Sequence, residues 1–287
     1  MMSRYSRYLN PYTDFGFKKL FGEEVNKDLL IDFLNQLLPN HHQIATLQFK
    51  NPENLPDLPL ERKAIFDIYC QSVTGERFVV EMQKAKLHFF KDRALFYSTF
   101  PIREQAKKGD WDFKLSAIYY VAILDFKYDE SEEKQKLLRE VALKDQDGQL
   151  FYDKLHFKFL QMPLFNKQEH ELKDHFDKWL YFLKYLDSFE HIPAILNEPI
   201  FQKAFNILEE ANLTPEQLEQ YQKSLLTYWE LKGVVDTAKD EGREEGRLEG
   251  RLEGIRLTAH KLKQEGLSVE IISKVTGLTV NEIEKLQ

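Results

Sequence analysis

The sequence predicts an α/β protein in which a mixed sheet flanked by helices is followed by an all-helical carboxyl-terminal region. Three observations support this class. In the first half of the 287-residue chain, short apolar runs typical of strands lie between segments whose apolar residues have helical spacing. The run at 116–126 is nearly continuous in apolar residues, as expected for a central strand covered on both faces. From about Lys167 onward the pattern is wholly helical.

The expected order in the first half is helix, three strands, helix and strand, with boundaries set by prolines and glycines. The first predicted elements are a helix over 14–38, in one or two pieces and ending before Pro39, a strand over 44–50 and a proline-rich loop over 51–59. Hairpin strands follow over 64–70 and 78–83, and then a helix over 87–108 with a kink at Pro101. The last two are a strand over 116–126 and a more peripheral strand over 156–160.

The second half is expected to hold three helices, near 168–187, 199–210 and 215–235. The last begins well, because Pro215 follows Thr214 at the first helical position. We therefore predict three parts of the chain, namely a domain over 1–165, a helical extension over 166–238, and a glycine-repeat helix with a small helical tail over 239–287.

Glycine recurs at every fourth position between 240 and 256. On one helix the glycines form a slowly drifting stripe, beside a glutamate stripe and an arginine stripe. Each glycine costs about 1 kcal/mol relative to alanine, so such a helix needs a packing partner. Two alternatives remain open, a flexible charged linker and a helix that self-associates by packing glutamates against arginines. The glycines are Gly242, Gly246, Gly250 and Gly254.

The last thirty residues predict two short helices, over 268–275 and 279–286, the second with a capping box formed by Thr279 and Glu282. This tail resembles small helix-turn-helix segments. Its second helix is acidic, which is unfavourable for reading a DNA groove, so we favour contact with protein.

Composition excludes several classes. Hydrophobic residues make up 43% of the chain, which argues against disorder, and no apolar stretch is long enough to span a membrane. The amino terminus lacks the apolar core of a signal peptide, and the single cysteine, Cys70, cannot form an internal disulfide. These features predict a cytoplasmic protein. The histidines lack the spacing of a zinc site, and no glycine-rich phosphate loop precedes a helix.

The predicted hairpin carries the candidate chemistry. Folding it about Thr74 places Asp67 opposite Glu81, and side chains opposed in this way are roughly 4.5–5.5 Å apart at Cβ. Gln83 shares a strand face with Glu81 because side chains alternate. Two buried carboxylates need a neutralising partner, and a hard cation such as Mg²⁺ prefers oxygen ligands. Asp67, Glu81 and the carbonyl of Met82 are candidate ligands, leaving the remaining positions to water and phosphate.

Asp67 followed by Glu81-x-Gln83 resembles the PD-(D/E)XK nuclease signature, especially its recombination-promoting nuclease and transposase branch. The likeness covers residues 10 to about 165 well and the rest loosely. Supporting matches are the block Thr13–Gly22, the helix residues Arg93, Tyr97 and Gln105, the strand end Ile123–Phe126, and the glycine-glutamate repeats.

The resemblance implies a restriction-endonuclease-like fold and metal-dependent cleavage of double-stranded DNA. Asp67 and Glu81 correspond to metal ligands, and Gln83 occupies the position of the superfamily's lysine. Glutamine stays neutral, so it cannot act as lysine would toward an anionic leaving group. Lys84 is adjacent, but we expect it to point to the opposite face of the strand. The DNA-contacting residues that we predict are Lys18, Arg93, Tyr97 and Gln105.

The segment 84–108 strengthens this expectation, because it holds seven Lys and Arg residues against two acids. A basic helix beside a carboxylate pair suits the phosphate backbone of DNA, with Arg93 and Tyr97 on one face as a phosphate clamp. The alternative is an ordinary solvated helix face.

Other assignments are possible for the acidic residues. Asp67 and Glu81 could belong to a structural ion network with Arg62, Arg77 or Lys18. For Asp14 we favour a helix-capping role over a place near the metal.

Two functions follow from these expectations. The first is a Mg²⁺-dependent DNA endonuclease linked to recombination or mobile elements. The alternative is a nuclease-fold scaffold, a homo-oligomer joined through the carboxyl-terminal helix, that binds DNA or protein with little catalysis.

Overall fold

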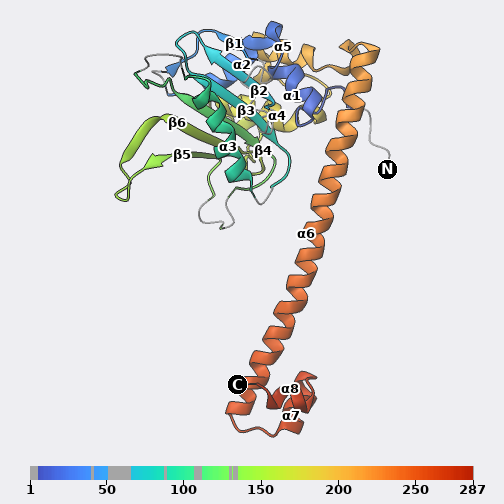
Figure 1. Cartoon of the computed structure of the whole chain (residues 1–287). Coiled ribbons are helices and arrows are strands. Elements are labelled where there is room, and N and C mark those ends of the chain that lie inside the picture. Colours follow the sequence, from blue (N-terminus) through green and yellow to red (C-terminus); the bar gives the residue numbers. More distant parts are fainter. Residues whose placement is uncertain are drawn as a thin grey trace. The chain divides into compact units, whose positions relative to one another are not determined.

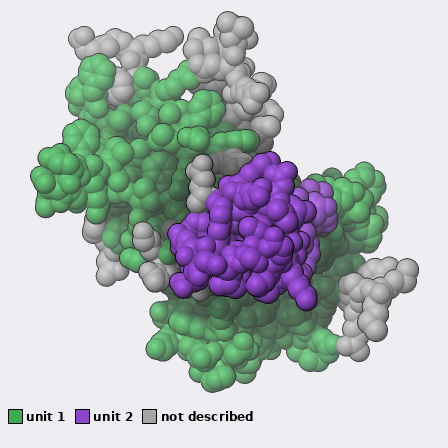
Figure 2. Space-filling model, turned by 90° about the horizontal axis from the view of Figure 1, so that it is seen from below, with its two compact units in different colours: residues 1–231 green, residues 232–287 purple. Residues whose placement is uncertain are grey.

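The structure is a computed structural model that describes residues 6–39, 42–50, 66–86, 89–106, 112–128, 131 and 135–286. The proline-rich loop predicted at 51–59 and the first hairpin residues lie outside this part of the chain. The chain forms two compact units, residues 1–231 and residues 232–287, which Figure 2 shows in different colours.

The described part of the first unit contains a six-stranded sheet in the order β1-β2-β3-β4-β6-β5 (Figure 1). β1 to β3 pair antiparallel, β4 lies parallel to both β3 and β6, and β5 pairs antiparallel with β6. The predicted mixed sheet is therefore confirmed. The strands are β1 (Leu47–Phe49), β2 (Ile68–Ser72), β3 (Arg77–Gln83), β4 (Ile118–Leu124), β5 (Leu138–Lys144) and β6 (Leu150–Gln161).

One strand prediction needs correction, and one strand was missed. The strand expected at 156–160 is longer, at Leu150–Gln161, and it lies between β4 and β5 in the sheet instead of at its periphery. β5 itself was not predicted. Its residues are mostly exposed, and as an edge strand it carries charged side chains that mask its pattern. A turn closed by Gly148, at φ 79°, joins β5 to β6.

The helices of the first unit agree broadly with the apolar spacing. The segment predicted at 14–38 forms two helices, and the one predicted at 87–108 is shorter, with Pro101 in its last turn. The helices are α1 (Asp14–Phe21), α2 (Lys27–Asn35), α3 (Phe90–Arg103), α4 (His175–Tyr185), α5 (Pro199–Ile207) and the first part of α6 (Pro215–Gln264).

The two faces of the sheet are covered by different helices (Figure 1). On one face, residues of α1, α2, α4 and α5 pack against alternate residues of β2, β3 and β4, such as Val80 and Val121. On the other face, α3 packs through Phe90 and Ala94 against Val79 and Tyr120. Because strand side chains alternate between faces, Glu81 and Gln83 share the α3 face with Val79.

The second unit consists of the remainder of α6, followed by α7 (Val269–Thr276) and α8 (Val280–Glu284). Its small core includes Ala259, Ile272 and Ile283. The predicted capping box of Thr279 and Glu282 is present. The glycine-repeat segment is helical within α6, and the described residues from 229 to 254 are all exposed.

Two properties expected from composition concern the chain as a whole. Cys70, the single cysteine, is fully buried in β2. Among the described residues, no helix combines the length and the apolar character needed to cross a membrane.

Candidate active site

The β2–β3 hairpin brings Asp67 and Glu81 together as the sequence predicts. Ile68 pairs with Val80, the register in which the preceding residue lies opposite Glu81. Asp67 stands just before β2, and its Oδ2 accepts a hydrogen bond of 2.7 Å from the amide of Met82. The carboxylate is thereby held against the next strand at the end of the hairpin.

Glu81 lies deeper, with a side chain only 1% exposed. Gln83 Nε2 donates a hydrogen bond of 2.8 Å to Glu81 Oε2, which agrees with the expected shared face. Arg93 Nη2, from α3, lies 3.6 Å from the same oxygen. The other oxygen, Glu81 Oε1, is buried and has no hydrogen-bond partner among the described residues.

The pKa values of this pair show that the folded protein disfavours the charged form of both carboxyl groups. Burial raises the pKa of Glu81 to about 8, the charge of Asp67 adds to the increase, and Arg93 opposes it. Burial also raises the pKa of Asp67, although the hydrogen bond from Met82 acts in the opposite direction. Both shifts have the direction expected for two buried carboxyl groups that share one site.

These residues have the donor chemistry of a divalent-cation site. Two carboxylates converge, and Glu81 Oε1 is an orphaned buried acceptor that a cation would satisfy. Within the described ranges, no three His, Cys, Asp or Glu side chains are grouped so that they could hold a metal.

A cavity of about 530 Å³ opens beside Asp67. α1 contributes Asp14 and Lys18 to its wall, and these two residues form an ion pair of 2.9 Å. Thr13 caps α1, since its hydroxyl accepts a hydrogen bond of 3.0 Å from the amide of Gly16. The favoured capping role of Asp14 is therefore wrong, and its carboxylate faces the same cavity as Asp67.

Lys84 is also close to this cavity. Burial lowers the pKa of its amine, while the nearby charges of Asp14 and Asp67 raise it. Its position follows from alternation, because β3 ends at Gln83 and the next side chain points away from Glu81. Lys84 thus lies near Asp14 and Lys18 of α1, on the opposite face that the sequence predicts for it.

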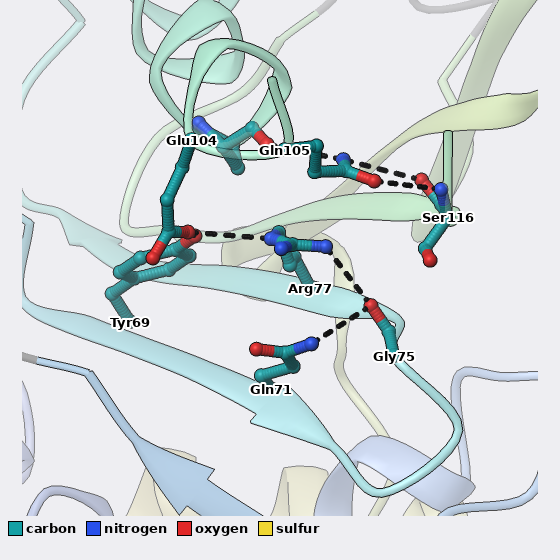
Figure 3. A network of polar contacts seen from close by, with 8 residues as sticks. Tyr69, Gln71, Gly75, Arg77, Glu104, Gln105 and Ser116 are labelled. Carbon is teal, nitrogen blue, oxygen red and sulfur yellow. Dashed lines mark hydrogen bonds and ion pairs between the residues drawn. The ribbon is translucent and has the colours of Figure 1, made fainter. Parts of the chain in front are cut away.

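The structure places the other predicted DNA contacts in different settings. The Arg93 guanidinium lies over the ring of Tyr97 at 4.9 Å, so the tyrosine acts as a platform for the arginine. Gln105 lies near the turn end of the hairpin, and its amide bonds to the backbone of Ser116, with Ser116 N to Gln105 Oε1 at 2.7 Å (Figure 3). In this arrangement the Gln105 amide is engaged within the protein.

Arg77 and Lys18, which the sequence offered as ion-pair partners of Asp67 and Glu81, pair with other carboxylates. Arg77 pairs with Glu104 at 3.3 Å, at the turn end of the hairpin (Figure 3). Lys18 pairs with Asp14, and Arg62 lies outside the described residues. Among the described residues, the cation that pairs with Glu81 is Arg93, which the sequence suggested only as a DNA contact.

Helix α6 supplies cavity residues that the sequence did not suggest. Gln220, Lys223 and Ser224 line the cavity beside Asp67. Ser224 Oγ accepts a hydrogen bond of 3.0 Å from the amide of Phe15 at the start of α1. Phe15 and Ser224 are more than two hundred positions apart in the sequence, and no local pattern indicates such a contact.

A comparison with known families shows to which family the chain belongs. The family model of PD-(D/E)XK nuclease family transposases matches residues 11–238. The chain belongs to this family. The resemblance noted in the sequence and the restriction-endonuclease-like fold are thereby confirmed. No curated protein and no solved structure matches the chain.

Membership in the PD-(D/E)XK nuclease transposase family associates the chain with nucleases and mobile elements. Nucleases of this kind typically use divalent metals, and the family implies a DNA substrate. The matched range also includes the first part of α6, the helix that lines the cavity beside Asp67.

Proposed function

We propose that the chain is a Mg²⁺-dependent DNA endonuclease that acts in recombination or in the movement of mobile elements, in the cytoplasm. Asp67 and Glu81, with the carbonyl of Met82, would hold the metal. The observation that carries this proposal is Glu81 Oε1, a buried carboxylate oxygen without a partner in the described structure, beside a second carboxylate in a nuclease-family chain. The protein would be more stable with an apolar or fully hydrogen-bonded residue there, since a buried polar group without a hydrogen-bond partner costs about 1–3 kcal/mol.

When bound, a divalent cation neutralises the developing charge of phosphodiester hydrolysis and lowers the pKa of a bound water. Gln83 holds Glu81 in place through the hydrogen bond at Oε2. Because Nε2 of Gln83 is committed to Glu81, its Oε1 is the atom suited to accept a hydrogen bond from the attacking water. Arg93 offers its guanidinium to the scissile phosphate, and Lys18, Tyr97 and Gln105 are proposed as further contacts along the DNA.

The test is cleavage of supercoiled plasmid by the purified protein with Mg²⁺, with Mn²⁺ and with chelator. We expect nicking or linearisation that depends on metal and falls by at least about a hundredfold in Asp67→Ala and Glu81→Ala, because each removes a metal ligand. Glu169→Ala, at an exposed position, is the matched control. Cleavage that persists in both site variants would refute the assignment.

A second candidate function is an oligomeric scaffold with little catalysis. Two features favour it, namely Gln83 in place of lysine and the exposed glycine-repeat part of α6. At each glycine from Gly242 to Gly254 an added Cβ would meet no atom within 4 Å, so nothing in the described chain covers this stripe. We propose that a second copy packs there, with glutamates of one helix facing arginines of the other.

A further inference from the structure

Two buried polar atoms on different elements lack hydrogen-bond partners at the same place. One is Glu81 Oε1 on β3, an acceptor, and the other is Arg93 Nε on α3, a donor; neither finds a partner in the described ranges. The two side chains approach each other elsewhere, at 3.6 Å between Arg93 Nη2 and Glu81 Oε2. This separation exceeds the roughly 2.7–2.9 Å of a charge-assisted hydrogen bond. Their ion pair is therefore loose, and each group keeps one unmet atom.

The guanidinium is held so that it can serve both Glu81 and a ligand. It lies over the Tyr97 ring at 4.9 Å, and that ring packs against Phe66 at 5.3 Å. Stacking on the ring holds the guanidinium in one orientation without using its N–H donors. About a third of the Arg93 side chain is exposed, against 1% of Glu81, so a ligand from solvent can reach the arginine more readily than the carboxylate.

The two unmet atoms call for opposite partners. A cation would satisfy Glu81 Oε1, and an anion would satisfy Arg93 Nε. A phosphate group that ligates a divalent cation provides both at once, because its oxygens accept from guanidinium donors and coordinate metal. A free cation alone would satisfy only Glu81 Oε1, and a free phosphate alone would satisfy only Arg93 Nε.

We propose that Arg93 is the partner of the Glu81 carboxyl group in the metal-free chain and that it would transfer to a DNA phosphate when a divalent cation binds Glu81. This inference rests on the proposed nuclease function and adds a coupling between metal binding and DNA binding. Without DNA, Arg93 competes with the metal for the carboxylate. With DNA, a phosphate would draw Arg93 away and leave the Glu81 carboxylate to the cation, so each ligand would tighten the binding of the other.

Calorimetric titration of the full chain with Ca²⁺, with and without a short DNA duplex, measures this coupling directly. For the wild type we expect Ca²⁺ affinity to rise at least about fivefold when DNA is present, the low end of ordinary coupling between sites. In Arg93→Gln we expect tighter Ca²⁺ binding than wild type in the absence of DNA, because a competing charge is gone, and little further gain with DNA. Arg93→Lys keeps the positive charge but lacks the planar guanidinium. It should still compete with Ca²⁺ for Glu81, and it should lose most of the gain in Ca²⁺ affinity that DNA gives the wild type.

Lys91→Gln is the matched control. It removes one positive charge from the same helix, but Lys91 lies over the Tyr128 ring at 4.7 Å and not beside Glu81. We expect it to lower DNA affinity while leaving the coupling ratio unchanged. Thermal unfolding of each variant checks that it is folded; if Arg93→Gln is not, Arg93→Lys carries the comparison.

The outcomes separate this inference from the function on which it rests. A wild type that binds neither Ca²⁺ nor DNA would remove the nuclease proposal itself. A wild type that binds both, with the same coupling in Arg93→Gln, would overturn the role of Arg93 alone. Weaker Ca²⁺ binding by Arg93→Gln without DNA would also overturn it, since a purely structural arginine would act in that way.

Discussion

Glu81 illustrates how single residues set the properties of this site. Its carboxyl group is buried, shares space with Asp67 and is only partly compensated by Arg93. Such an arrangement is unfavourable for a folded protein unless the group is protonated or bound to a cation. The cost is concentrated at the position where we propose that a metal binds, and functional sites are where proteins tolerate such a cost.

The pH dependence of stability tests this view. The pKa of Glu81 is about 8 in the folded chain, against an ordinary value of 4.5, so the folded state holds this proton more tightly than the unfolded state. The contribution to stability is therefore complete below pH 4.5 and is lost as pH rises toward 8. Above this range, Glu81→Gln should stabilise the metal-free protein by at least about 2 kcal/mol, since one unit of pKa corresponds to about 1.4 kcal/mol.

Denaturant unfolding in chelator across pH measures this difference. The exposed Glu169→Gln is the control and should follow the wild type at every pH. If Glu81→Gln also follows the wild type, the carboxyl group is not strained in the folded state. Adding Mg²⁺ should stabilise the wild type and leave Glu81→Gln unchanged, because bound metal contributes to stability by mass action.

At the scale of elements, the first part and the later part of α6 have different surroundings. Near its start, Tyr221 Oη accepts a hydrogen bond of 3.0 Å from Asn10 N, and Tyr228 Oη donates one of 3.2 Å to Asp125. In the glycine-repeat part the described residues are exposed, and the helix there has only local ion pairs such as Arg247 with Glu244, 2.6 Å apart. Exposed local pairs contribute little, roughly 0.3–0.5 kcal/mol each.

We expect the glycine-repeat part of α6 to be helical because it self-associates, and the mass in solution tests this. Removal of residues 240–287 should yield a monomer, while the full chain should be a dimer or larger. Gly246→Ala with Gly250→Ala should lower the mass as well, because methyl groups would prevent close approach of a second helix. The same pair should raise helix content, since each alanine gains about 1 kcal/mol within a helix.

Gly233→Ala provides the control, because its added Cβ also meets open space but lies outside the repeat. It should raise helix content without changing the mass. A full chain that is monomeric at high concentration would contradict self-association. A double variant with unchanged oligomeric mass would show that the contact does not use the glycine stripe.

At the scale of the whole molecule, the first unit depends on parts of the chain that are far apart in sequence. Its core includes Tyr221 and Tyr228 of α6 together with residues of α1 and α4. The division into units falls at 231/232, whereas the boundaries predicted from the sequence, at 165/166 and 238/239, remain predictions. The helices after the sheet complete the face of the sheet opposite α3.

Truncation should reveal this dependence. A chain that ends at Leu231 keeps the whole first unit, so we expect its melting temperature to stay within a few degrees of the full chain's and its plasmid cleavage to persist. A chain that ends at Leu213 loses Tyr221 and Ser224, which leaves the amides of Asn10 and Phe15 without their acceptors. We expect it to unfold more easily or to aggregate. Equal stability of the two chains would show that α6 is dispensable to the first unit.

The sequence by itself determined the fold class, the family resemblance and the β2–β3 hairpin, because each depends on local pattern. The pairing of Asp67 with Glu81 needed only the alternation of strand side chains and one turn between them. Local signals also predicted most helices and the capping box of the tail.

Only the tertiary structure decided how distant segments complete the site. It placed β6 between β4 and β5, Arg93 beside Glu81, and α6 against the start of α1. It also assigned the cap of α1 to Thr13, which leaves Asp14 in the cavity with Asp67. These contacts join residues whose separation along the chain imposes no period or spacing, so they follow from the packing of whole elements and from the burial of charge, which local pattern does not encode.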